Sequence, residues 1–258
     1  MTTQIVNKSD KKLWLAAIKP PMYSVAIMPI WVGTAIAFWE KNRIDWSIFL
    51  TFITSAILIL AWENISNDVF DSETGIDKNK HHSLVNLTGN KDLMFWLGNL
   101  CLFLGILGIL IISWWLQDLT VIGLIFLCCF LGYIYQGPPF RLGYQGLGEI
   151  ICFFAFGPLA ISAAYYSQTK TWSITSLTAS IIIGITTTII LFCSHFHQVR
   201  DDLAAGKRSP IVRMGTKAGS QVLNWSCGIV FVLISICVGL GFFPVWTLLS
   251  FSGLPFSI

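Results

Sequence analysis

The feature that most constrains this chain is a series of long apolar stretches. Crossing a bilayer as a helix takes about 18 or more mostly apolar residues, and such windows recur along the 258 residues. Because a bilayer core holds no water to satisfy open backbone groups, each stretch should be helical. The sequence therefore predicts an all-α, polytopic membrane bundle with about eight visible spans. They lie near 22–39, 46–66, 93–115, 119–136, 148–166, 172–196 and 221–240, with a shorter stretch at 243–258.

Composition narrows the function classes. The chain is 55% hydrophobic and only 11% charged, which is typical of a lipid bilayer as its surroundings. All seven cysteines fall inside apolar stretches without paired spacing, so neither a disulfide framework nor a zinc site is expected. The sequence has no basic stripe of the kind that binds nucleic acid, so no nucleic-acid partner is expected. The first apolar stretch leads straight into further spans without a small-residue cleavage site, so it is interpreted as a retained helix.

Basic residues are divided unevenly between the two ends of the predicted spans. One set of loops carries only Lys41, Arg43 and Lys170 of the sixteen Lys and Arg residues. The N-terminal tail and the loops after the second, fourth and sixth spans carry the rest, which predicts that this end is cytoplasmic. Lys8, Lys11, Lys12 and Lys19 are interpreted as topological charges.

Acidic residues need another explanation, because Asp and Glu contribute little to topology. In NDVFDSETGIDKNKHH, which begins at Asn67, the spacing places Asn64, Asn67, Asp68 and Asp71 on one face of a helix end. Carboxylates so close together repel each other unless a cation binds between them. Mg²⁺ takes carboxylate oxygens and keeps positions open for phosphate, so this motif predicts a magnesium site.

A second loop, HFHQVRDDLAAGKRSPIVRMGTK, repeats this order of acids followed by bases. Gln198, Asp201 and Asp202 leave an apolar helix at similar spacing, and Lys207 and Arg208 follow. Lys78 and Lys80 follow the first motif in the same way, and Lys and Arg suit phosphate. HHSLVNLTGNK and KRSPIVRMGTK also share Ser, Gly and Lys at equal spacing. Such a faint repeat is expected of a duplicated helical bundle whose two halves face a central cavity. Two acidic motifs above an apolar interior suit a substrate with a diphosphate head and a lipid tail.

These motifs, with YQGPPFRLGYQGLGE between them, resemble the UbiA superfamily of intramembrane aromatic prenyltransferases. The resemblance implies a single domain over 1–258, a bundle that usually has nine helices, and catalysis that depends on Mg²⁺. Carried over by position, it makes Asp68, Asp71 and Asp202 catalytic and gives Asn64 to the first metal motif. It gives Lys207, Arg208 and Arg141 to diphosphate binding.

The chain departs from the family pattern at two places. Gln198 stands where many members have an aspartate; its oxygen can still bind a metal, and Asp201 can supply the missing charge. After Leu240 only eighteen residues follow, fewer than the family's last two helices need, which predicts a chain truncated at its C-terminus.

KPPMYSVAIMPI, near the N-terminus, and AAGKRSPIVRMGT are most similar to the branch that prenylates 1,4-dihydroxy-2-naphthoate, and within it to cyanobacterial phytyltransferases. This resemblance implies transfer of a phytyl group from its diphosphate with loss of CO₂, in phylloquinone or menaquinone synthesis, in a thylakoid or plasma membrane.

Residues facing the acceptor or the allylic cation are expected near the two loops. Tyr133 and Tyr135, with Phe140 and Tyr144, surround the Gly-Pro-Pro turn, and aromatic faces stabilise cations. Asn67 and His197 are the polar candidates. Three alternatives stay open: another aromatic acceptor such as homogentisate or 4-hydroxybenzoate, an ion-coupled transporter, or an inactive binding protein.

Overall fold

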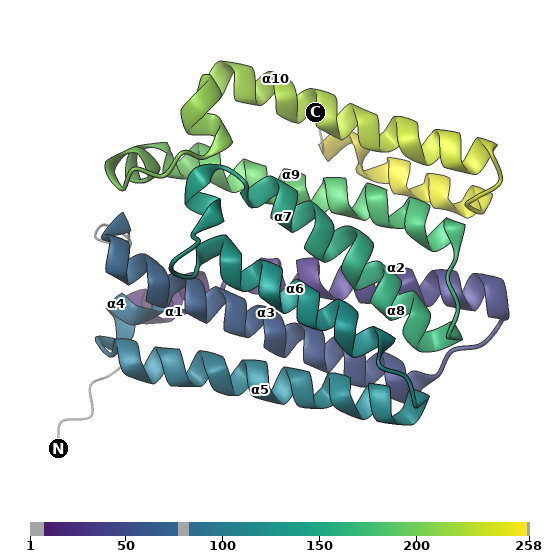
Figure 1. The fold of residues 1–258 in the computed structure, drawn as a ribbon. Coiled ribbons are helices and arrows are strands. Elements are labelled where there is room, and N and C mark those ends of the chain that lie inside the picture. Colours follow the sequence, from purple (N-terminus) through teal and green to yellow (C-terminus); the bar gives the residue numbers. More distant parts are fainter. Residues whose placement is uncertain (1–7, 77–82, 257–258) are drawn as a thin grey trace.

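The structure is a computed structural model that describes residues 8–76 and 83–256 (Figure 1). Within these ranges the regular elements are all helical. The longer ones, in chain order, are α1 (Lys8–Ile18), α2 (Tyr23–Lys41), α3 (Trp46–Thr74), α5 (Lys91–Leu116), α6 (Thr120–Gln136), α7 (Gly148–Phe154), α8 (Ala160–Thr169), α9 (Ile174–Ala204), α10 (Pro210–Gly239) and η5 (Val245–Phe256). Four short turns of helix, η1 (Pro20–Met22), α4 (Leu84–Thr88), η3 (Leu142–Gln145) and η4 (Ala155–Leu159), connect them.

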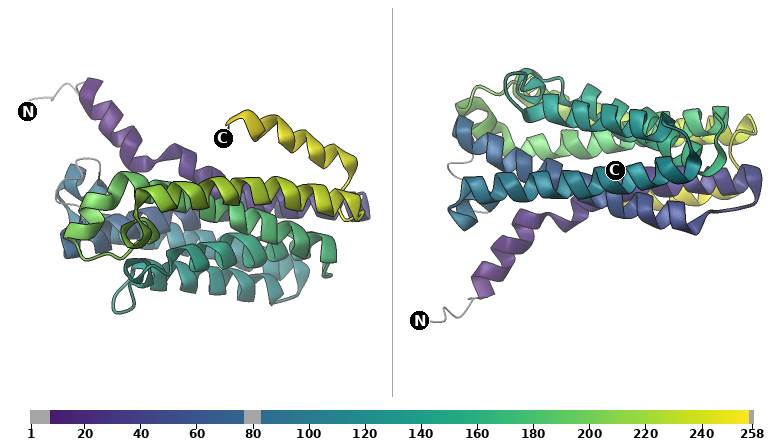
Figure 2. Two further views of the ribbon diagram at one scale, coloured as in Figure 1. Left: turned by 90° about the horizontal axis from the view of Figure 1, so that it is seen from above. Right: turned by 60° about the horizontal axis from the view of Figure 1, so that its bottom comes forward.

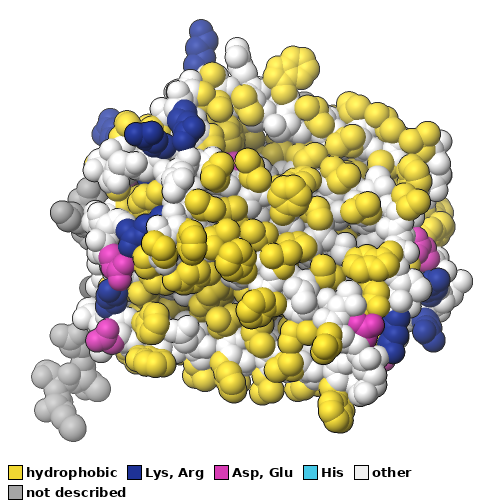
Figure 3. Space-filling view, viewed as in Figure 1, with side chains coloured by type: hydrophobic (Ala, Val, Ile, Leu, Met, Phe, Trp, Pro, Cys, Tyr) yellow, Lys and Arg dark blue, Asp and Glu magenta, His cyan; other side chains and the backbone are white. Residues whose placement is uncertain are grey.

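The helices are long and apolar enough for the predicted membrane bundle. Six helical segments of the described chain have the length and composition of membrane spans, and two shorter apolar helices, Thr120–Gln136 and Val245–Leu254, accompany them. Hydrophobic side chains cover the middle of the molecule, whereas charged side chains gather at its two ends (Figure 3). The prediction of an all-α integral membrane protein is confirmed.

Small residues bring the helices close together. A Cβ atom on Gly105 of α5 would lie 2.7 Å from a side-chain carbon of Ile59 on α3, and one on Gly33 of α2 would lie 2.7 Å from Ala164 of α8. Membrane helices associate through such close van der Waals contacts, because in lipid there is no hydrophobic effect to drive apolar side chains together. Phe52, Ile109 and Val121 form part of the core between α3, α5 and α6.

Two helices continue past their apolar stretches. The predicted spans 46–66 and 172–196 are observed as α3, to Thr74, and α9, to Ala204. One face of each helix end packs against neighbouring segments, where Asp68 and Asp202 are buried, whereas residues on other faces, such as Gln198, are exposed. The two acidic motifs therefore sit on rigid helix ends, at the end of the bundle called here the motif end. It carries α4 and the α9–α10 connection, at the left of Figure 1.

Other spans are interrupted. The predicted span 148–166 consists of α7, a π-helical turn at η4 and α8, because Pro158 has no backbone N–H to donate. In α10, Gly215 has φ 79° and ψ 160°, which breaks the helix near its start. At the chain ends, α1 leaves the bundle at an angle and η5 folds back beside α10 (Figure 2).

Candidate active site

The first acidic motif faces the junction of α1 and η1. Lys19, at φ 51°, extends its ammonium to 2.7 Å from Asn64 Oδ1 and 3.7 Å from Asp68 Oδ1. The other oxygen of Asp68 accepts a 2.8 Å hydrogen bond from the backbone N–H of Leu84, the first residue of α4. Asp68 is completely buried. A cation and a helix N-terminus thus compensate this carboxylate, as a buried charge requires.

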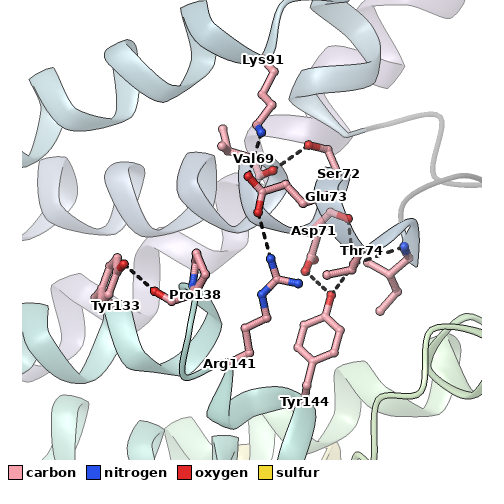
Figure 4. Close-up of polar contacts among 11 residues, drawn as sticks. Val69, Asp71, Ser72, Glu73, Thr74, Lys91, Tyr133, Pro138, Arg141 and Tyr144 are labelled. Carbon is pink, nitrogen blue, oxygen red and sulfur yellow. Dashed lines mark hydrogen bonds and ion pairs between the residues drawn. The ribbon is translucent and has the colours of Figure 1, made fainter.

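Asp71, one turn further along α3, faces η3 instead. Its Oδ1 accepts a 2.7 Å hydrogen bond from the hydroxyl of Tyr144, which also lies 2.8 Å from the hydroxyl of Thr74 (Figure 4). Burial, and then the nearby Asp71 carboxylate, raise the pKa of Tyr144 above its ordinary value. The phenol therefore keeps its proton and remains a donor to Asp71.

Arg141 lies beside the same motif, held by an ion pair. Its guanidinium donates to Glu73 Oε2 at 2.9 Å, and Lys91 reaches Glu73 Oε1 at 2.7 Å (Figure 4). Glu73 is exposed, so the pair contributes little to stability. Its consequence is positional, because it places the guanidinium near Tyr144 and Asp71.

The second acidic motif is built around Asp202, which is also completely buried. Lys207 Nζ lies 3.4 Å from Asp202 Oδ1, and His195 Nδ1 lies 3.5 Å from Oδ2. On the other side of the imidazole, His195 Nε2 lies 3.2 Å from Glu149 Oε1 of α7. Among the described residues, none gives either carboxylate oxygen of Asp202 a hydrogen bond of normal geometry.

Tyr144 connects the two motifs. Its hydroxyl binds Asp71, while its carbonyl oxygen accepts a 2.8 Å hydrogen bond from the backbone N–H of Arg208. Lys207 Nζ lies 5.7 Å from the centroid of the Tyr144 ring, within the range of a cation–π contact. The structure therefore brings Asp71, Arg141, Asp202 and the start of the second basic segment around one tyrosine.

Other candidates lie less centrally. Gln198 and His197 are exposed on α9, while Asp201, Asn67 and Tyr135 are half-buried. The Tyr133 hydroxyl donates to the carbonyl of Pro138 at 2.7 Å. Lys78 and Lys80 lie outside the described residues. The roles assigned to all of these residues stay predictions.

Three residues of the site were missed or undervalued by the sequence analysis. Lys19 was interpreted as a topological charge, yet it contacts Asn64 and Asp68. Tyr144 was only one of several aromatic residues near a turn, and Glu149 was not considered. The available signal was an isolated charge at the edge of an apolar segment, which Lys19 and Glu149 share.

The donor set fits Mg²⁺ bound together with a phosphorylated substrate. No group of three His, Cys, Asp or Glu side chains in the described chain forms a complete metal site. Mg²⁺, however, is commonly held by one or two carboxylates and completes its shell with water and substrate phosphates. Asp202 suits this arrangement, because its buried oxygens face Lys207 and His195 but accept no hydrogen bond from the described part of the chain.

Comparisons with known proteins extend over nearly the whole chain. The model of the UbiA prenyltransferase family matches residues 26–258. A Synechocystis protein named 2-carboxy-1,4-naphthoquinone phytyltransferase is 58% identical over 250 residues, which cover 97% of this chain and 81% of that protein. The chloroplastic protein of the same name from Arabidopsis thaliana is 42% identical and aligns with 95% of this chain and 66% of its own length.

Among solved structures, a UbiA homolog from Archaeoglobus fulgidus bound to GPP and Mg²⁺ superposes with a TM-score of 0.71. The alignment covers 92% of this chain and 81% of that one at 15% sequence identity. At this identity the likeness establishes the fold.

Proposed function

The chain belongs to the UbiA prenyltransferase family, and from this premise we propose that it transfers a phytyl group from phytyl diphosphate to 1,4-dihydroxy-2-naphthoate. The observation that carries the proposal is the 58% identity to the Synechocystis phytyltransferase over 97% of this chain. The product would enter phylloquinone or menaquinone synthesis.

The chain's own residues divide the work along the bundle. Lys207, Arg208 and Arg141 lie around Tyr144 and bind the diphosphate. The residues that would hold Mg²⁺ are Asn64, Asp68 and Asp71 on α3 and Gln198, Asp201 and Asp202 on α9. When bound, Mg²⁺ would neutralise the charge that develops on the departing diphosphate.

The prenyl chain lies among apolar helices, where water cannot capture the allylic cation that forms when the carbon–oxygen bond breaks. The electron-rich ring attacks this cation at the carbon that carries the carboxylate. A carbon–carbon bond forms there, the bond to the carboxylate breaks, and its electron pair returns to the ring as CO₂ leaves.

The direct test is turnover in membranes. Purified protein in lipid vesicles is incubated with phytyl diphosphate and 1,4-dihydroxy-2-naphthoate, with Mg²⁺ or with EDTA, and prenylated product is followed by mass spectrometry. We expect product only with Mg²⁺. The same assay is run with homogentisate and with 4-hydroxybenzoate, and product from one of these but not from the naphthoate would show that the proposed acceptor is wrong. Equal turnover in EDTA would show that the reaction does not need Mg²⁺.

We propose that the protein lies in a plasma or thylakoid membrane. Its motif end faces the cytoplasm, because this end carries most of the Lys and Arg residues. Cysteines introduced at exposed positions test this: Lys217→Cys lies towards the motif end and Arg43→Cys at the other end. In sealed right-side-out vesicles, a membrane-impermeant maleimide should label Arg43→Cys. Labelling of Lys217→Cys should not exceed that of the parent protein. The reverse pattern would invert the orientation.

A further inference from the structure

Glu149 is a carboxylate that the reaction outlined above does not use. It lies in the first turn of α7, and its side chain is 15% exposed. Its partner is His195 Nε2, 3.2 Å away on α9, and neither of its oxygens accepts a hydrogen bond of normal geometry from the described residues. A charge buried between two apolar helices is costly unless it is paired, so its presence points to a function.

His195 lies between Glu149 and the second acidic motif. The imidazole is only 3% exposed, and its two nitrogens face two carboxylates, Glu149 at Nε2 and Asp202 at Nδ1. An ionised carboxylate only accepts hydrogen bonds, so a ring nitrogen that carries a proton is favoured beside either one. With a carboxylate on each side, the ring is oriented so that Nδ1 faces Asp202 and Nε2 faces Glu149.

Asp202 itself depends on its neighbours for orientation. It is fully buried near the end of α9, and its ion-pair contacts are Lys207 at 3.4 Å and His195 at 3.5 Å, both longer than a normal hydrogen bond. The two groups approach different oxygens of the carboxylate. If the His195 ring turned, the Oδ2 side of the carboxylate would lose this contact.

We propose that Glu149, acting through the His195 ring, is a positioning residue for the Asp202 carboxylate. This inference rests on the proposed function, because it takes Asp202 as a metal ligand. Groups that orient metal ligands matter for binding: their replacement typically lowers metal affinity or activity by about 10- to 100-fold.

The experiment measures Mn²⁺ binding by electron paramagnetic resonance, with inorganic pyrophosphate present, alongside turnover. Glu149→Gln keeps the size of the side chain and removes its charge, and we expect Mn²⁺ affinity and kcat each to fall about 10-fold. Glu149→Asp keeps the charge on a shorter stem and should lose less. Glu40→Gln, which removes one carboxylate at the opposite end of the bundle, is the matched control and should retain wild-type affinity.

A double-mutant cycle separates positioning from general destabilisation. His195→Asn can still direct an N–H at Asp202 but no longer reaches Glu149, so adding Glu149→Gln to it should lower Mn²⁺ affinity no further. Additive effects would overturn the proposal, as would wild-type Mn²⁺ affinity in folded Glu149→Gln and Glu149→Asp. Mn²⁺ binding is measured without donor or acceptor, so a wrong phytyl or naphthoate assignment would abolish turnover of the wild type and leave this result standing.

Discussion

Carboxylates lie at both ends of the bundle, but their surroundings differ: Asp202 at the motif end is completely buried, whereas Glu40 at the opposite end is exposed. At the end opposite the motifs, Glu40 accepts hydrogen bonds from the hydroxyls of Tyr165 and Ser173, and Asp118 accepts from Thr120 and Tyr166. These partners are neutral donors at hydrogen-bonding distance. At the motif end, Asp202 and Glu149 instead face cationic or ionisable groups and accept no hydrogen bond of normal geometry from the described residues.

The difference teaches what each end is for. A carboxylate whose two oxygens accept hydrogen bonds from neutral donors on other helices acts as a structural clamp, and Glu40 joins α2 to α8 and to the start of α9 in this way. A buried carboxylate oxygen that accepts no hydrogen bond destabilises the fold, but it remains able to bind a cation or a donor group of a ligand. The first end should therefore govern stability, and the motif end should govern activity.

The largest expected effect is that of Asp202→Asn. The amide keeps the shape of the side chain but removes the charge that Lys207 and His195 face, so we expect turnover to fall at least about 100-fold. Membrane insertion should be unchanged, because topology depends little on acids. Turnover in lipid vesicles and the amount of protein in the membrane fraction are the measurements; activity close to wild type at limiting Mg²⁺ would remove Asp202 from the site.

Lys207→Ala should have the next largest effect. The ammonium lies near both Asp202 and the Tyr144 ring, where it suits a diphosphate, so KM for the prenyl diphosphate should rise about 10-fold. Lys207→Arg keeps the charge and should lose less. Steady-state kinetics with varied donor concentration measures the effect, and an unchanged KM would exclude Lys207 from diphosphate binding.

Tyr144→Phe tests the connection between the two motifs. It removes the hydroxyl that donates to Asp71 and leaves in place the carbonyl that accepts from Arg208. One lost hydrogen bond is worth about 1 kcal/mol, which corresponds to about a fivefold fall in kcat/KM. Because the pKa of Tyr144 is raised, the difference between the two proteins should be constant from pH 6 to 9. A difference that vanished within this range would show that the phenol loses its proton there.

The smallest effect on activity is expected for Asp118→Asn at the opposite end. The hydroxyl and backbone N–H of Thr120, with the Tyr166 hydroxyl, lower the pKa of Asp118. A carboxyl group with a lowered folded-state pKa stabilises the protein above its ordinary pKa of about 3.9, and this contribution is lost as the pH falls through the folded-state value. Wild type should therefore unfold at a higher temperature than Asp118→Asn at pH 7, and the gap should close at strongly acidic pH.

Turnover of Asp118→Asn at pH 7 should equal that of the wild type. A clear loss of activity in a protein that remained folded would break the division between a structural end and a functional end.

The bundle could be predicted from the sequence because the spans follow from hydropathy alone. The stretch 119–136, for example, corresponds to α6 at Thr120–Gln136. Hydropathy failed at the polar ends of α3 and α9, where the helices continue past their apolar stretches and bury one face against protein. It also could not foresee the interruption at Pro158, since a π-helical turn adds no polar residue to the stretch.

The site was predicted as two motifs, and what escaped prediction was their contacts. Spacing along one helix places Asn64 and Asp68 on one face, but nothing in the sequence pairs Asp71 with Tyr144, which lies 73 residues away. Glu149 and His195 likewise meet only because α7 packs against α9. The contact of Lys19 with Asn64 was not foreseen, because a lysine before a first span usually reports topology.

The contact between Lys19 and the first motif also bears on the order in which the protein is made. Lys19 leaves the ribosome 45 residues before Asn64, so the cation that faces Asn64 and Asp68 already exists when α3 emerges. Tyr144, the partner of Asp71, follows that residue by 73 positions. Along a growing chain, therefore, the Lys19 ammonium precedes Asp68, whereas the Tyr144 hydroxyl that donates to Asp71 is made only after α4, α5 and α6.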